Sequence, residues 1–267
     1  MNPPADRTIW AEAEPFERYI GRWSRLVARE LVAWLALPPG GRWLDVGCGT
    51  GALAAAIVDA ADPAGVDGLD LAPGLVAYAQ GHIRDPRARF EVGDAQSLPV
   101  PPRLYDVAVA GLLLNFLPAP ERAVAGMAAT VRPGGTVGSY VWDYAGRMEM
   151  MRHFWTGAVA LDPAIAERDD TRRFSRWNAD RLAALFQESG LAAVTTRPIE
   201  VPTVFRDFDD YWLPFLGGQG SAPGYLASLA PSRRETVRDA VRARLPVRPD
   251  GSIALVARAW AVRGVRA

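Results

Sequence analysis

The fold is decided by one stretch, Trp43-Leu44-Asp45-Val46-Gly47-Cys48-Gly49-Thr50-Gly51. Its first four residues are typical of a short buried strand, and the apolar run at 52–58 that follows the glycines predicts a helix. A strand that turns into a helix through glycines leaves the N–H groups of the first helical turn exposed. Glycine is required there because the backbone takes positive φ and because a Cβ would strike a ligand on the turn. The stretch therefore predicts a nucleotide-type site at the carboxyl end of a first parallel strand.

Two classes of cofactor fit this loop. The pattern Gly47-x-Gly49-x-x-Ala52 matches the alanine-ending form of the dinucleotide fingerprint. That fingerprint expects an acidic residue about 20 positions further on, and both Asp67 and Asp70 are candidates. Asp45 argues against a dinucleotide, because a carboxylate at the end of the strand would repel a pyrophosphate but suits an ammonium group. The tight third glycine, Gly51, also suits a smaller ligand.

The eight residues from Leu44 to Gly51 resemble motif I of the class I S-adenosylmethionine (SAM) dependent methyltransferases, in particular the small-molecule type 11, UbiE-like family. The resemblance covers residues 43–142 closely and residues 178–201 and 251–262 in outline. It implies an α/β fold with a Rossmann-like, doubly wound sheet of seven mostly parallel strands, the last of them antiparallel. It also implies SAM as the cofactor and S-adenosylhomocysteine (SAH) as its product.

Two later segments extend the resemblance to the rest of the cofactor. Gly-Leu-Asp-Leu-Ala-Pro at 68–73 matches the family's second motif, which implies that Asp70 accepts hydrogen bonds from ribose hydroxyls and that Leu71 lies against adenine. Asp67 stands inside or before the same strand and is expected to be a solvated turn residue. Gly-Asp-Ala at 93–95 follows the third strand. It implies that Asp94 accepts from the exocyclic amine of adenine and that the Ala95 N–H donates to a ring nitrogen.

Residues 1–42 predict a loosely held arm followed by a lid helix. Apolar residues recur every three or four positions from Pro15 to Leu35, which indicates an amphipathic helix that breaks at Gly21. In many small-molecule methyltransferases such a segment folds over the SAM pocket. Tyr19 and Arg22 would then reach the ligand's carboxylate or close the pocket; the alternative is a helix packed on the sheet edge with solvated arginines. The expected cofactor-binding set is Tyr19, Arg22, Asp45, Gly47, Cys48, Gly49, Gly51, Asp70, Leu71, Asp94, Ala95 and Gly111.

We expect one domain over residues 1–267, with a SAM-binding core at 43–142 and two insertions, 143–177 and 202–250, that form the substrate cap. Methyl transfer from SAM is chiefly a positioning task, but a phenol or alcohol acceptor needs a base. His153 is the first candidate, and Asn115 or Tyr144 the next. The alternatives are a structural role for His153 in the first insertion and a helix-capping or hydrogen-bonded core amide for Asn115. The methionines and aromatic residues at 148–155 suit either a pocket for an apolar substrate or an ordinary helix core.

The composition of the chain argues against several classes of binding partner. The formal net charge is zero, and residues 115–118 lack the motif of amino-methylating DNA enzymes, so we expect no nucleic acid. One cysteine and two histidines without ligand spacing predict no metal site. The sequence has no apolar run long enough for a signal peptide or a membrane span, so we expect a cytoplasmic monomer or homodimer.

The expected activity is methylation of a small aromatic or lipophilic acceptor, on oxygen, nitrogen or carbon. One alternative is a protein of the same fold that binds SAM but catalyses another reaction or serves as a binding module, because fold does not imply function. A reductase that uses NAD(P) is the third hypothesis.

Overall fold

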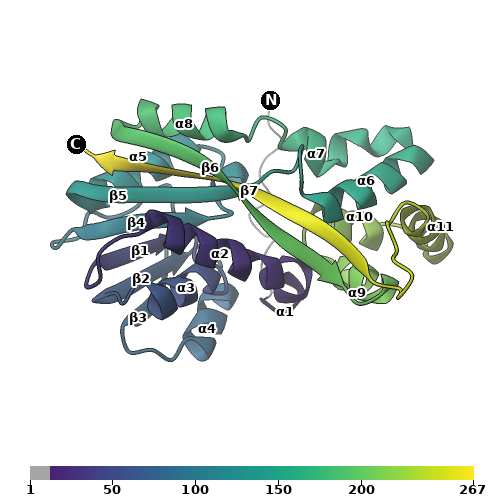
Figure 1. The fold of residues 1–267 in the computed structure, drawn as a ribbon, viewed down its shortest axis with the longest axis horizontal. Helices are drawn as coiled ribbons and strands as arrows, with labels where there is room; N and C mark the ends of the chain where they lie inside the picture. The colour runs from purple at the N-terminus through teal and green to yellow at the C-terminus, as the bar shows by residue number, and fades with distance from the viewer. Residues whose placement is uncertain (1–12) are drawn as a thin grey trace.

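The computed structural model describes residues 13–267, so the predicted arm at 1–12 lies outside the described residues. A seven-stranded sheet in the order β3-β2-β1-β4-β5-β7-β6 forms the centre of the molecule (Figure 1). Only β7 runs antiparallel, to both β5 and β6, which confirms the predicted doubly wound sheet with an antiparallel last strand. The strands are β1 (Arg42–Val46), β2 (Gly65–Asp70), β3 (Ala88–Val92), β4 (Tyr105–Gly111), β5 (Val131–Trp142), β6 (Leu191–Phe205) and β7 (Ile253–Arg266).

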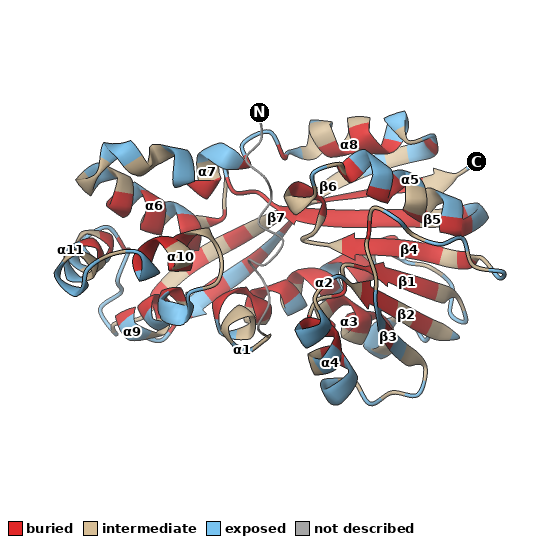
Figure 2. Ribbon diagram, turned by 180° about the vertical axis from the view of Figure 1, so that it is seen from behind, coloured by how far each residue is buried: buried red, intermediate tan, exposed pale blue. Residues whose placement is uncertain are grey.

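The strands at the centre of the sheet are apolar because helices cover both of its faces. On β1, Trp43 and Val46 are fully buried, and so are Ala108 to Ala110 on β4 (Figure 2). The helices of the core are α1 (Ala13–Phe16), α2 (Arg22–Leu35), α3 (Ala52–Ala60), α4 (Pro73–His82), α5 (Pro120–Thr130) and α8 (Ala179–Glu188). Figure 1 looks onto α2 and α3, whereas α5 is in front in Figure 2, which views the opposite face.

Strands β5, β6 and β7 are longer than the sequence predicts. The sequence predicts a turn at 132–135 and the fifth strand over 136–142. The observed β5 begins at Val131, because Val131 pairs with Tyr105 before a bulge shifts the register. Strand β6 continues past 201 to Phe205, since Thr203 and Phe205 keep the alternation of buried and exposed positions. Together with β7 it extends beyond the parallel strands toward the helices from α9 (Phe208–Trp212) to α11 (Pro231–Arg242) (Figure 1). The second insertion therefore occupies residues 206–252.

These long strands carry a helical cap, built from both insertions around aromatic side chains. Its segments are α6 (Glu149–Leu161), η3 (Pro163–Arg168), α7 (Asp170–Arg173), α9 (Phe208–Trp212), η4 (Leu213–Gly217), α10 (Ser221–Ala227) and α11 (Pro231–Arg242). At the centre, the rings of Phe154 and Phe215 stack with their centroids 4.6 Å apart. Met148, Met151 and Trp155 are fully or almost fully buried. Of the two interpretations of residues 148–155, the helix core is therefore correct.

The N-terminal helix joins the cap to the sheet. Between α1 and α2 the chain forms a π-helical turn, η1 (Glu17–Gly21). The predicted break at Gly21 is absent, because Gly21 keeps helical dihedrals (φ −54°, ψ −42°) and only the helix type changes there. The Tyr19 hydroxyl donates to the Sδ of Met151 on α6 over 2.8 Å. No helix among the residues that the structure describes is both long and apolar enough to cross a membrane.

Candidate cofactor and acceptor site

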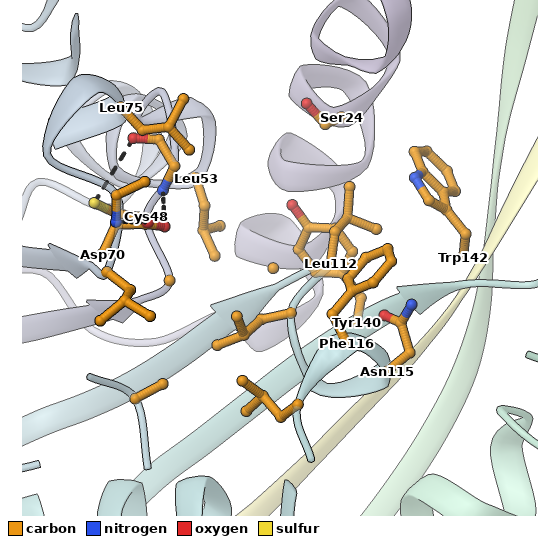
Figure 3. A pocket seen from close by; sticks show the side chains of 18 of the residues that line it. Ser24, Cys48, Leu53, Asp70, Leu75, Leu112, Asn115, Phe116, Tyr140 and Trp142 are labelled. Carbon is orange, nitrogen blue, oxygen red and sulfur yellow. Dashed lines mark hydrogen bonds between the residues drawn. The ribbon is translucent and has the colours of Figure 1, made fainter. Parts of the chain in front are cut away.

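A cavity of about 970 Å³ opens at the carboxyl ends of the parallel strands. It lies beside β1 and β4, between which the strand order of the sheet reverses. This is the position at which doubly wound folds bind ligands. The loop after β1, the ends of β2, β4 and β5 and the N-terminal helix form its walls, and the cap segment 167–177 completes them. Figure 3 shows Cys48 and Asp70 on one side of this cavity and Asn115 and Trp142 on the other. We call these sides the cofactor end and the acceptor end, after the roles that the sequence analysis predicts for Asp70 and Asn115.

The glycine loop has the predicted positive φ values, at Gly47, Gly49 and Gly51. Its turn is closed by the N–H groups of Gly47 and Cys48, which both donate to the carbonyl of Leu69. A Cβ on Gly49 would meet no atom within 4 Å, and because Gly49 lines the cavity it would take space from a ligand. Gly51 does not line the cavity; a Cβ there would collide with Ile83, so this glycine serves close packing beneath the loop.

Asp45 is a buried carboxylate at the cavity wall without a hydrogen-bond partner. The residue is fully buried, and both carboxylate oxygens lack a partner among the described residues. Burial is the main cause that raises its pKa to about 7, and the charge of Asp70 adds to this. The nearby N–H of Ala54 lowers the pKa in part without making a hydrogen bond to either oxygen. Because an unpartnered buried anion is costly, this site favours a cationic ligand group.

The remaining residues of the cofactor end are held by backbone groups. The two oxygens of Asp70 accept from the N–H groups of Gly49 and Ala72, over 3.0 and 2.9 Å, and burial raises the pKa of this carboxyl. Asp94 accepts from the N–H of Gln96 over 2.9 Å. The structure thus brings together nine predicted residues along the cavity: Asp45, Gly47, Cys48, Gly49, Asp70, Leu71, Asp94, Ala95 and Gly111. Asp67, expected to be solvated, instead pairs with Arg42 and accepts from the Tyr105 hydroxyl.

The acceptor end contains buried polar groups that have no partner in the described part of the chain. Asn115 stands on the short η2 helix (Leu114–Phe116) after β4, is 8 % exposed, and has neither amide atom hydrogen-bonded. The Trp142 indole N–H, at the end of β5, is 2 % exposed and also without an acceptor. Tyr140 and Tyr144 line the same end, and burial raises the pKa of both hydroxyls.

Leu112 is a lining residue that sequence reasoning missed. It has a φ of +57°, a conformation that is rare for a large side chain and that concentrates at functional sites. Its N–H donates to the carbonyl of Tyr140 over 2.8 Å, which fixes the start of the loop that carries Asn115. Its position, directly after the end of a central parallel strand, is the signal that could have identified it.

The N-terminal helix presents a different face to the cavity than predicted. Phe16, Ile20 and Ser24, four residues apart, line the cavity. Tyr19 contacts Met151 of the cap instead, and the Arg22 guanidinium forms an ion pair with Asp210 over 3.0 Å. The segment therefore contributes one face to the cavity wall, while Tyr19 and Arg22 are directed to the cap.

His153 does not line the cavity either. It is half-buried on α6, and burial is the main cause that lowers its pKa. Glu149, Arg152 and Arg244 are the charged groups that act on it. Phe154 and Trp155, its neighbours in the chain, belong to the cap core. The structure thus does not bring His153 to Asn115, whereas Tyr144 does line the acceptor end.

Comparison with known proteins identifies the family. A methyltransferase domain family matches residues 44–135. A demethylmenaquinone methyltransferase of Bacillus licheniformis is 34 % identical over 177 residues, which cover 61 % of this chain and 75 % of that protein. This chain belongs to the class I SAM-dependent methyltransferases. A trans-aconitate 2-methyltransferase of Variovorax paradoxus is 29 % identical over 61 % of this chain and 58 % of its own length.

The match to several relatives is partial, and the fold is shared more widely than the sequence. The chain spans between a third and three fifths of the length of the curated relatives that it matches first. A solved structure of Haemonchus contortus phosphoethanolamine N-methyltransferase 2 with SAH superimposes with a TM-score of 0.61, at 13 % identity. That superposition covers all of this chain and 60 % of the other, and it shows a common fold. Membership of this family identifies SAM as the cofactor.

Proposed function

We propose that this chain transfers the methyl group of SAM to a small, mainly apolar acceptor bound beside Asn115 and Trp142. One observation carries the proposal: a single cavity joins the acidic cofactor end to an aromatic acceptor end that has unpartnered polar groups. A binding module for SAM alone has no need of the second compartment. The aromatic walls of that compartment, Phe116, Phe174 and Trp177, favour an aromatic or lipophilic acceptor.

At the cofactor end, Asp45 supports the fit to SAM. Its two unpartnered oxygens would accept hydrogen bonds from the α-ammonium group, which would offset the cost of burying the carboxylate. Asp70, already oriented by two backbone N–H groups, would accept from the ribose hydroxyls. Leu71, Asp94 and Ala95, which line the same end, would enclose the adenine.

At the acceptor end, the chain's task is to hold the nucleophile in line and to exclude water. SAM supplies a methyl group already activated by the positive charge on its sulfur. The Asn115 amide has both a donor and an acceptor to offer, and the Trp142 indole offers a donor, so these two groups can orient a polar atom of the acceptor. Tyr140 and Tyr144 keep their protons, because burial raises their pKa, and therefore act as hydrogen-bond donors instead of bases.

The test combines cofactor binding with turnover. Calorimetric titration with SAH, and with NADH in parallel, establishes the cofactor; SAM is then incubated with a panel of aromatic and lipophilic acceptors, and SAH release is followed by mass spectrometry. We expect SAH to bind and at least one acceptor to be methylated. Asn115→Ala should lower kcat at least tenfold with the dissociation constant of SAH unchanged, whereas the exposed Gln187→Ala on α8 should change neither.

Three outcomes would contradict the proposal in different ways. SAH binding without methylation of any acceptor would favour a SAM-binding protein with another reaction or a binding role. Binding of NADH alone would overturn the cofactor. Full turnover in Asn115→Ala would remove the role given to this amide.

A further inference from the structure

Charged side chains of both signs line the cavity. Asp45, Asp70 and Asp94 line the cofactor end, whereas Arg173 and Arg176 line the cavity from the cap. Arg173 is the last residue of α7, and Arg176 lies in the segment between α7 and α8, where the chain returns from the cap to the sheet. The cavity wall therefore includes cationic side chains, which an uncharged lipophilic acceptor would not require.

Arg173 already has partners within the protein. Its guanidinium contacts the Asp170 carboxylate over 3.3 Å and the Ser221 hydroxyl over 2.8 Å, and it lies over the Phe174 ring. Asp170 is itself buried, and it also accepts from the Trp155 indole. These contacts link α6, α7 and α10, so Arg173 is used mainly to hold the cap together.

Arg176 differs from Arg173, because none of the described residues forms a hydrogen bond or an ion pair with its guanidinium. It stands between Phe174 and Trp177, both of which are buried and line the cavity. Glu167 is the carboxylate on the same part of the wall, but it forms no ion pair with either arginine in the described chain. Arg176 is exposed to solvent at this part of the wall, so its guanidinium is accessible to an anion that enters the cavity.

We propose that the methyl acceptor is an organic acid whose carboxylate is bound by Arg176, while Asn115 and Trp142 contact the part of the molecule that receives the methyl group. The proposal rests on the function proposed above and adds the chemical class of the acceptor. Arginine suits this task because its planar fork binds both oxygens of a carboxylate. A negative charge on the acceptor is also attracted by the positive sulfur of SAM.

The experiment compares two probes of nearly the same shape, 2-naphthoate and the neutral 2-naphthamide, by calorimetric titration into the protein saturated with SAH. The wild type should bind 2-naphthoate about tenfold more tightly than 2-naphthamide, as expected for one partly exposed charge-assisted hydrogen-bonded pair. Arg176→Gln should abolish this preference by weakening 2-naphthoate alone. Arg176→Lys should restore part of it, since it keeps the charge without the fork.

Arg172→Gln is the matched control, because Arg172 is an exposed arginine of α7 that does not line the cavity. It should leave the affinity for both probes unchanged. Equal affinities for the two probes in the wild type, failure of both to bind, or an equal loss in the two glutamine variants would each overturn the proposal. SAH saturation is verified separately for every variant, so failure to bind SAH would count against the proposed function, and a result with SAH bound tests only the role of Arg176.

Discussion

Replacing Asp45 with asparagine should stabilise the free protein and at the same time weaken its binding of SAM. The carboxylate is fully buried with both oxygens unpartnered, so its charge has a cost that a cofactor ammonium group would offset. Asparagine is nearly isosteric and neutral, so it removes the charge without creating a cavity. Stability and binding should therefore change in opposite directions.

The pKa of Asp45 gives the size of the effect. Its folded-state value of about 7 exceeds the ordinary value of 3.8, so the folded protein binds a proton that the unfolded chain has released between these two pH values. Asp45 therefore lowers stability progressively as the pH rises from about 4 to 7, by about 4 kcal/mol in total at 1.36 kcal/mol per pKa unit. About 2.5 kcal/mol of this loss of unfolding free energy occurs between pH 5 and pH 8.

The assay is thermal unfolding of cofactor-free wild type and Asp45→Asn at pH 5 and pH 8. The melting-temperature difference in favour of the variant should be about 5 °C larger at pH 8 than at pH 5, since 1 kcal/mol shifts a protein of this size by about 2 °C. Comparison of the two pH values cancels any constant cost of burying the asparagine amide. Exposed Asp59→Asn on α3 is the control and should show no such dependence. SAH should bind the Asp45 variant at least about 30-fold more weakly, because a buried charge pair is lost.

A difference between wild type and Asp45→Asn that is the same at pH 5 and pH 8 would refute this reasoning, because it would mean that Asp45 does not take up a proton on folding. Unchanged affinity for SAH would separately refute its role toward the ammonium group. Among the neighbouring groups, the Cys48 thiol and the Tyr140 hydroxyl remain protonated at pH 8, because burial raises the pKa of both. Burial also raises the pKa of Asp70, which is present in both proteins, so the comparison of wild type with variant removes its own contribution to first order.

Three further predictions follow from the same site and from the cap. SAH should bind about tenfold more tightly at pH 8 than at pH 6, because the ionised fraction of Asp45 rises about tenfold across a pKa of about 7, and calorimetry in two buffers should detect the released proton. Gly49→Ala should weaken SAH binding with a loss of about 1 kcal/mol in stability, whereas Gly51→Ala should mainly lower the melting temperature, because its Cβ would collide with Ile83; equal effects on binding would contradict this division. Arg258→Met should destabilise the protein by about 3 kcal/mol in urea unfolding, because it leaves the buried Asp143 without its arginine partner; a change below 1 kcal/mol would contradict this role.

The cofactor end could be predicted from the sequence because it is encoded locally. The strand–glycine–helix pattern fixes where Asp45 and the loop lie, and the next strand places Asp70 beside them through the parallel pairing of β1 with β2. The direction in which a helix face points is instead set by packing against segments that are distant in the sequence. Tyr19 and His153 stand in segments with suitable composition, but packing of these segments against the cap core directs Tyr19 to Met151 and keeps His153 away from the cavity.

The same packing explains why the two insertions contribute differently to the cavity. Among the described residues, the first insertion contributes Tyr144 and the segment 167–177 to the cavity wall, whereas residues 206–252 contribute none. The second insertion supports the first instead, since Phe215 stacks on Phe154 of α6 and the Tyr211 hydroxyl donates to the carbonyl of Met150. Substitutions in the second insertion should then lower stability before they change the acceptor. Choice of acceptor should depend on 167–177 and on the loop after β4, and Arg176 is the residue at which a single change should alter it without disturbing the cofactor.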